Sequence, residues 1–171
     1  MPGSEDAAHR GVGQPAGGMV MKPRILVSAC LLGVNCRYDG GGKEIPGIDA
    51  LMERAELIPV CPEILGGLPT PRVPSERVGD RVLARDGRDV SAAFERGAGE
   101  ALKLAKLFGA RLALLKERSP SCGAGQIYDG SFGGGLVPGD GVAAQLLKAN
   151  GVSVYGESRI RELIDVLKEE G

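Results

Sequence analysis

Residues 25–30 read I-L-V-S-A-C, a short continuous apolar run of the kind that forms a strand buried on both faces of a sheet. Similar runs follow at residues 57–61, 111–115 and 152–155. Helical patterns separate them, and we expect helices over residues 46–55, 91–108, 141–150 and 160–167. This alternation predicts an α/β fold: a single-domain, mainly parallel open sheet with flanking helices, Rossmann-like and three-layered.

Length and composition agree with one soluble domain. The chain has 171 residues, of which 43% are hydrophobic and 25% charged, and this composition excludes a mostly disordered chain. The formal net charge of -1 supplies no positive field that would draw the chain onto nucleic acid or an anionic membrane. Three Phe and three Tyr are too few to build stacking platforms for single-stranded nucleic acid.

The first 21 residues differ in character from the rest. Residues 1–21 are predicted to be a flexible N-terminal extension, and residues 22–171 to form the α/β domain. No apolar stretch approaches the ~20 residues that a membrane-spanning helix needs. The extension has neither the basic region nor the apolar run of a secretory signal, so we expect a cytoplasmic protein. The single histidine, His9, lies in the extension, which excludes a histidine-containing triad in the domain.

Chemically useful side chains follow three of the expected strands. The first strand ends at Cys30, the second runs into Cys61-Pro62-Glu63, and the third runs into residues 119–122, S-P-S-C. Because ligands of open α/β sheets bind beyond the carboxyl ends of the strands, we expect these residues to share one edge. The dinucleotide fingerprint G-x-G-x-x-G is absent after the first strand, which disfavours a nicotinamide or flavin cofactor.

The four cysteines are the candidate metal ligands of the domain. Their spacing contains no C-x-x-C pair, so neither a thioredoxin-like redox site nor a zinc ribbon is indicated. The alternatives are four packed thiols, a four-cysteine zinc site, or an iron–sulfur cluster. If three cysteines bind a four-iron cluster, one iron stays open to a substrate atom as a Lewis acid.

Two further segments stand apart from the regular pattern. Residues 66–89 read as a loop with a hairpin around residues 78–83, and their arginines are predicted to form a solvated face, with anion attraction as the alternative: Arg72, Arg77, Arg81, Arg85 and Arg88. Residues 123–141 hold eight glycines and read as a long loop, either a lid over the site or a flexible connection.

Three motifs in order resemble the thiouracil desulfidase family. They are A-C-L-L-G-V-N-C-R-Y-D-G at residues 29–40, C-P-E-I-L-G-G-L-P-T-P-R at residues 61–72 and S-P-S-C-G at residues 119–123, with D-G-R-D-V at residues 86–90 between them. The resemblance covers about residues 24–156. It implies an iron–sulfur-dependent, non-redox desulfidase that converts the thiocarbonyl of a thiolated nucleobase such as 2-thiouracil to a carbonyl and releases sulfide.

The same resemblance implies roles for individual residues. Cys30, Cys36 and Cys122 would hold a [4Fe-4S] cluster with one open iron. The acid/base carboxylate falls on Glu63 and the catalytic serine on Ser119. A carboxylate suits proton transfer, and a hydroxyl can relay a proton because it both donates and accepts.

Some assignments stay open at this level. Ser121 is a candidate substrate contact, and Cys61 is a fourth or alternative ligand, a persulfide carrier or a thiol packed beside the cluster. The expected substrate is a small thiolated molecule; membrane binding is not expected, nucleic acid is disfavoured, and a thiolated tRNA is kept as an alternative. The competing functions are a non-catalytic iron–sulfur or zinc-binding module, including a sulfur carrier, and a zinc-dependent hydrolase.

Overall fold

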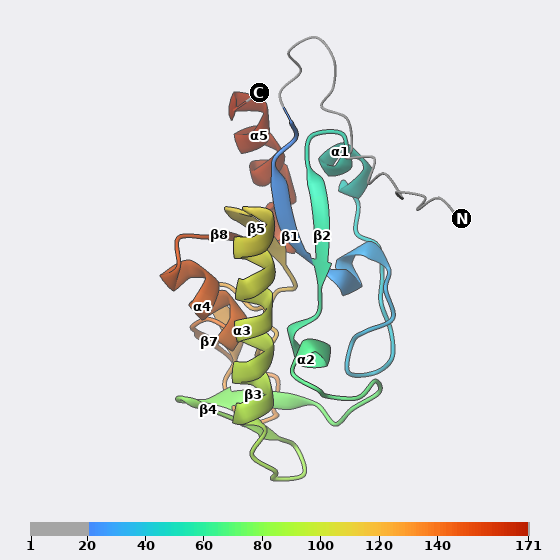
Figure 1. Cartoon of the computed structure of the whole chain (residues 1–171). Coiled ribbons are helices and arrows are strands. Elements are labelled where there is room, and N and C mark those ends of the chain that lie inside the picture. The colour runs from blue at the N-terminus through green and yellow to red at the C-terminus, as the bar shows by residue number, and fades with distance from the viewer. Residues whose placement is uncertain (1–20, 171) are drawn as a thin grey trace, which may run out of the picture.

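A computed structural model describes residues 21–170 and has a four-stranded sheet at its centre (Figure 1). All neighbouring strands are parallel, in the order β2-β1-β5-β8. Their bounds are Arg24–Ser28 for β1, Glu56–Val60 for β2, Leu112–Leu115 for β5 and Ser153–Gly156 for β8. The prediction of a parallel α/β sheet is therefore confirmed, with strand bounds within two residues of those expected.

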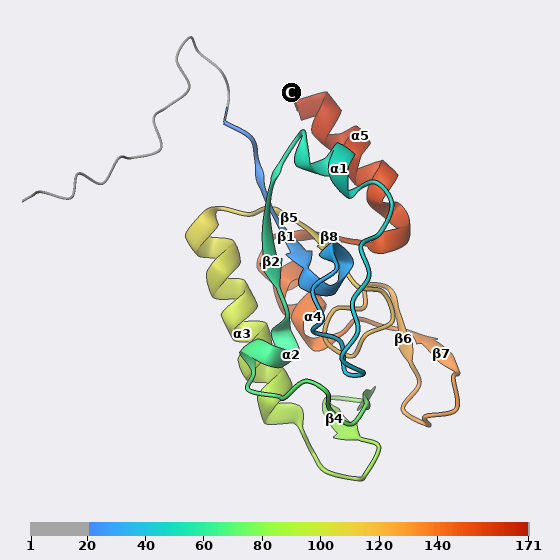
Figure 2. The same cartoon turned by 90° about the vertical axis from the view of Figure 1, so that its right-hand side faces the viewer.

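Helices cover both faces of this sheet, which makes three layers (Figure 2). One face carries α3 (Ser91–Phe108) and α4 (Val142–Ala149), and the other carries α1 (Ile48–Met52) and α5 (Ile160–Glu170). Successive residues of β1 point to opposite cores: Ile25 packs with the α1 and α5 side, and Leu26 with the α3 and α4 side. Because both faces are buried, the strand is apolar throughout rather than alternating.

The long helix α3 shows how local sequence sets an element. Its buried positions Phe94, Ala98, Ala101 and Ala105 recur every three or four residues, which places them on one face. The Asp89 carboxylate accepts the Ser91 amide at 2.9 Å at its beginning.

Four details differ from the sequence-based prediction. The first strand stops at Ser28 and Cys30 lies in a 3-10 turn, η1 (Ala29–Leu32), while α1 is shorter than the expected helix over residues 46–55. A one-turn helix, α2 (Pro62–Leu65), was not predicted. By contrast, the hairpin expected around residues 78–83 is confirmed, as β3 (Ser75–Val78) and β4 (Arg81–Ala84). The glycine-rich stretch is not all loop, since β6 (Gln126–Tyr128) and β7 (Leu136–Pro138) pair within it.

The short helix α2 packs with its backbone directly against α3. A Cβ atom on Gly66 would lie 2.0 Å from the Ala93 carbonyl oxygen, and one on Gly97 would lie 1.8 Å from that of Pro62. Neither position has room for a side chain, so the two glycines allow the close approach. This crossing fixes the position of Glu63, which α2 carries.

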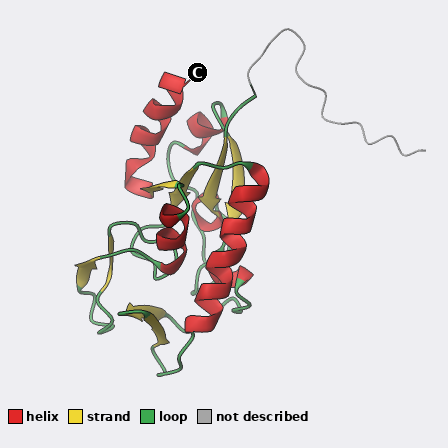
Figure 3. Cartoon of the chain, turned by 60° about the vertical axis from the view of Figure 1, so that its left-hand side comes forward, coloured by secondary structure: helices red, strands yellow, loops and turns green. Residues whose placement is uncertain are grey.

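Both small hairpins lie at the carboxyl end of the sheet, as the yellow strands at the bottom of Figure 3 show. The extension expected over residues 1–21 lies, apart from its last residue, outside the described residues. Within residues 21–170, no helix is both long enough and apolar enough to cross a membrane.

Candidate active site

A cavity of about 360 Å³ opens at the carboxyl edge of the sheet. The chain adds β2 on one side of β1 and β5 on the other, so the strand order reverses at β1 and leaves a crevice between the two following connections. The sequence-predicted residues all line this cavity, from the connections after β1, β2 and β5: Cys30, Cys36, Cys61, Glu63, Ser119, Ser121 and Cys122.

The cysteines of the cavity are all free thiols. Cys30, Cys36 and Cys122 are buried, and Cys61 is partly exposed, with its Sγ 3.7 Å from the Cys36 carbonyl oxygen. Burial, together with the neighbouring Cys61, raises the pKa values of Cys30 and Cys36. Burial raises the pKa of Cys122 to about 12. The raised pKa values favour the neutral thiol form of Cys30, Cys36 and Cys122, so these three thiols would lose protons on binding iron.

The arrangement of these thiols bears on the kind of metal centre. Among residues 21–170, no three Cys, His, Asp or Glu side chains form a group that could hold a single metal ion. A preformed zinc site needs all its ligand atoms within about 2.3 Å of one ion. In an iron–sulfur cluster each thiolate binds a separate iron, so the ligands stand further apart. The donor set, soft thiols from separate segments of one cavity, suits an iron–sulfur cluster, whose irons take thiolate ligands.

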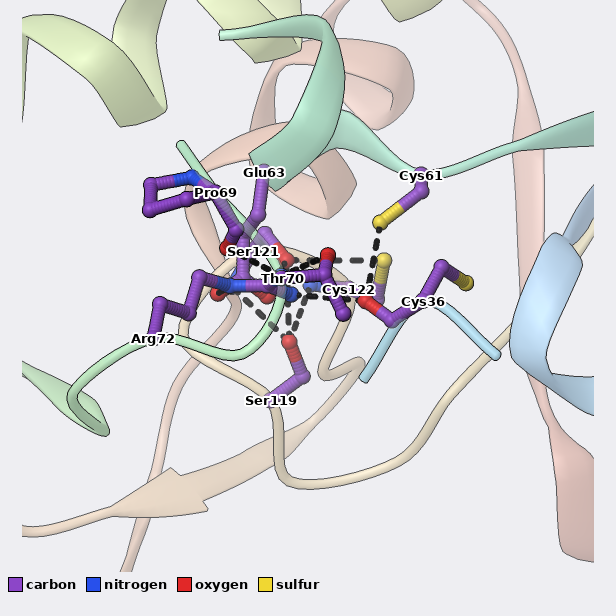
Figure 4. Close-up of polar contacts among 9 residues, drawn as sticks. All are labelled: Cys36, Cys61, Glu63, Pro69, Thr70, Arg72, Ser119, Ser121 and Cys122. Carbon is purple, nitrogen blue, oxygen red and sulfur yellow. Dashed lines mark hydrogen bonds and ion pairs between the residues drawn. The ribbon is translucent and has the colours of Figure 1, made fainter. Parts of the chain in front are cut away.

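Glu63 is held by a buried arginine. Arg72 Nε donates to Glu63 Oε1 at 3.1 Å, and their side chains are only 6% and 17% exposed. The same guanidinium donates to the Cys36 carbonyl oxygen at 2.9 Å, so it joins the Glu63 helix to the cysteine loop (Figure 4). The prediction that Arg72 belongs to a solvated face was wrong. Its place as the last residue of the motif over residues 61–72 was the signal that could have found it.

A chain of hydrogen bonds connects Glu63 to Ser119 (Figure 4). Ser121 Oγ donates to Glu63 Oε2 at 3.0 Å and lies 2.9 Å from Ser119 Oγ. A hydroxyl has one proton, so when Ser121 donates to the carboxylate it must accept from Ser119. Ser121 is only 1% exposed, which places it between the two groups rather than at the mouth of the cavity.

The turn after β5 is organised around Ser119. Its Oγ accepts the amides of Ser121 and Cys122, each at 3.1 Å, as a serine turn does. The Ser121 carbonyl oxygen accepts the Ala143 amide at 2.9 Å, near the beginning of α4. One tight turn therefore positions both the hydroxyl and the Cys122 thiol.

Comparisons with known proteins show the family to which this chain belongs. The chain matches the family described as 2-thiouracil desulfurase over residues 25–159. It is 39% identical over 150 residues to the uncharacterized protein YbbK of Bacillus subtilis, covering 82% of this chain and 99% of that protein. It is also similar to the solved structure of the [4Fe-4S]-dependent thiouracil desulfidase TudS, with 48% identity, a TM-score of 0.82, and coverage of 86% of this chain and 99% of that one. The resemblance read from the three motifs is confirmed: the chain belongs to the 2-thiouracil desulfurase family.

Proposed function

We propose that this protein is a desulfidase that replaces the thiocarbonyl sulfur of a small thiolated nucleobase by oxygen. One water enters and one hydrogen sulfide leaves, so C=S plus H₂O gives C=O plus H₂S with no change of oxidation state. The observation that carries the proposal is one cavity that unites three buried thiols with the hydrogen-bonded chain Glu63–Ser121–Ser119. The likeness to a [4Fe-4S]-dependent desulfidase supports it.

The cavity residues fit a [4Fe-4S] cluster. Cys30, Cys36 and Cys122 would hold three of the irons and leave the fourth without a protein ligand. The bound cluster supplies a soft Lewis acid that polarises the thiocarbonyl sulfur. Cys61 would stay a thiol packed beside the cluster, against the Cys36 carbonyl.

The protein's own side chains move the protons. As water attacks the thiocarbonyl carbon, its proton passes to Ser119 Oγ while the Ser119 proton moves through Ser121 to Glu63 Oε2. When the sulfur leaves, Glu63 returns this proton to it, and the second proton of the former water passes from the new hydroxyl to the sulfur as the C=O forms, which completes H₂S. Arg72 keeps the carboxylate in place throughout by binding its other oxygen, Oε1. In this proposal Ser121 is a relay rather than the direct substrate contact expected from the sequence.

The substrate and setting follow from the cavity and the thiols. A volume of about 360 Å³ lies in the range of small-molecule pockets, which favours a free base over a thiolated tRNA. We place the protein in the cytoplasm, where a reducing milieu keeps four free cysteines reduced.

The decisive experiment is reconstitution without oxygen, with iron and sulfide analysis followed by addition of 2-thiouracil. We expect a brown protein with about four irons per chain that releases uracil and sulfide. Cys30→Ala, Cys36→Ala and Cys122→Ala should each lose the cluster, whereas Cys61→Ala, the matched cysteine control, should keep it.

Variants of the proton chain separate chemistry from assembly. Glu63→Gln should keep the iron and lose about 10²–10⁴-fold in turnover. Ser119→Ala should lose turnover to a similar extent and also bind less iron, because Ser119 Oγ accepts the Cys122 amide. A brown protein that converts no thiolated base and passes its cluster to an acceptor protein would instead be a carrier. A colourless chain that takes up no iron would contradict the proposal outright.

A further inference from the structure

Aromatic residues are scarce in this chain and concentrated at the cavity. The whole sequence has three Phe and three Tyr, and three of these six line the cavity: Tyr38, Tyr128 and Phe132. They come from two connections, the cysteine loop after β1 and the β6–β7 hairpin. The cavity therefore adds aromatic surface to its thiols and carboxylate.

Phe132 sits at the tip of the hairpin in an unusual backbone conformation. Its φ of 58° lies in the left-handed region, which only one other non-glycine among residues 21–170, Arg118, enters. A bulky side chain rarely adopts this conformation because it costs conformational energy, so the surroundings must enforce it.

A buried carboxylate enforces it. Glu76 on β3 is 8% exposed, and its Oε1 accepts the Gly130 amide at 3.0 Å and the Phe132 amide at 3.1 Å. The Arg85 guanidinium lies over the Phe132 ring, 5.5 Å from its centre, in a cation–π contact. Two residues of the β3–β4 hairpin thus fix the backbone and the ring of one residue in the other hairpin.

We propose that Phe132 is the specificity-determining wall against which the planar ring of the substrate stacks, and that Glu76 and Arg85 are its positioning residues. This inference rests on the proposed function, since that function requires a flat heteroaromatic substrate. Stacking on an aromatic side chain recognises such a ring without reading its substituents. Phe132 acts on binding and leaves the proton chain of Glu63 untouched.

The test removes the ring without disturbing the backbone. Asn tolerates the left-handed region, so Phe132→Asn keeps the turn and loses only the aromatic surface. We expect the KM for 2-thiouracil and the Kd for uracil, the product, to rise about tenfold, with kcat and iron content unchanged. Phe132→Tyr should restore both constants to within about twofold of wild type.

Two controls accompany these variants. Phe108 pairs with Arg24 in the same kind of contact, at 5.7 Å, outside the cavity, so Phe108→Asn should leave KM and Kd unchanged. Glu76→Ala frees the hairpin tip and should raise KM, whereas Glu76→Gln, which still offers Oε1 to the two amides, should recover most of the affinity.

The outcomes separate this inference from the function beneath it. If wild-type protein converts 2-thiouracil and Phe132→Asn binds uracil as tightly as wild type, the wall is disproved and the desulfidase stands. If Phe132→Asn lowers iron content or kcat at constant KM, its role is structural and the inference also fails. A wild-type protein that neither binds uracil nor consumes 2-thiouracil refutes the proposed function, and the wall with it.

Discussion

The guanidinium of Arg72 binds four acceptors. Besides Glu63 and the Cys36 carbonyl oxygen, it donates to the Pro69 carbonyl oxygen and to Thr70 Oγ1, each at 3.1 Å. An arginine can do this because its donors form a rigid planar fork. Removing it would leave a largely buried carboxylate and a carbonyl without their partner.

We expect Arg72→Met to lower the free energy of unfolding by about 3 kcal/mol, since breaking a buried ion pair leaves one charge uncompensated. Urea unfolding of the cluster-free chain measures the change. Adding Glu63→Gln should return about 1 kcal/mol, because the second change removes the stranded charge. Equal stability of Arg72→Met and wild type would show that the pair contributes nothing to the fold.

The carboxyl group of Glu117 makes the stability of the fold depend on pH. Burial alone would raise its pKa, but hydrogen bonds donated by the Ser158 hydroxyl and amide outweigh burial and lower it. A carboxyl whose folded pKa lies below its unfolded value stabilises the fold above the unfolded pKa and loses that contribution as pH falls through the folded pKa.

Glu117→Gln should therefore be less stable than wild type by about 1 kcal/mol near neutral pH. The difference should shrink as the pH falls from about 5 towards about 3. Urea unfolding of the cluster-free proteins across this range measures it. A difference that stays constant with pH would mean that the charge of Glu117 is not what matters.

The sequence indicated which residues gather at the candidate site, but not which groups their side chains contact. Cys30, Cys36, Glu63, Ser119 and Cys122 were candidates because their motifs resemble those of the thiouracil desulfidase family, and the structure brings all five to one cavity. The burial of Arg72 and the position of Ser121 between Glu63 and Ser119 depend on contacts across 9 and 58 positions of the chain. The motif over residues 61–72 marks Arg72 as a residue of interest, but no local pattern encodes which groups Arg72 and Ser121 contact.

At the scale of elements, the crossing of α2 and α3 is the contact that determines where Glu63 stands. Gly97→Ala would drive a Cβ into the Pro62 carbonyl oxygen, 1.8 Å away, and push α2 away from α3. We expect a loss of about 3 kcal/mol in unfolding free energy, together with lower turnover, because α2 carries the carboxylate.

Gly99 offers a matched control on the same helix, since a Cβ there would meet nothing within 4 Å. Gly99→Ala should stabilise the protein by about 0.5–1 kcal/mol and leave turnover unchanged, as alanine favours a helix. Thermal unfolding and the uracil-release assay compare the two variants. Similar effects of both substitutions would contradict the backbone contact between α2 and α3.

Long helices and buried apolar strands were predictable from the sequence, and the short elements around the cavity were not. α3 has 18 residues and several turns of periodic apolar positions, so both of its ends were located. α2 has four residues, and β6 and β7 have three each, which is too short for any period to show. These short elements carry Glu63 or flank Phe132, and tertiary contacts rather than local preference stabilise them.

At the scale of the whole molecule, the proposed cluster would join segments that lie far apart in the sequence. Cys30 and Cys36 follow β1, and Cys122 follows β5, with α1, α2 and α3 between them. A ligand that binds only the folded chain stabilises it. We expect the cluster-loaded protein to melt about 5–10 °C above the cluster-free protein, and Cys122→Ala to melt at one temperature whether or not iron is supplied.

Differential scanning calorimetry without oxygen measures this prediction. The loss of brown colour should coincide with the unfolding transition of the loaded protein. Identical melting temperatures with and without the cluster would mean that cluster binding by the three thiols does not stabilise the fold.

The serine turn after β5 has a consequence for anyone who wishes to redesign this catalyst. Ser119 Oγ accepts the backbone amide of Cys122. A substitution in residues 119–122 that is meant to change reactivity should therefore also weaken cluster binding. The tip of the β6–β7 hairpin is tied down from outside, by Glu76 and Arg85. A library confined to residues 128–134 would therefore diversify substrate scope while the chemical machinery is inherited unchanged.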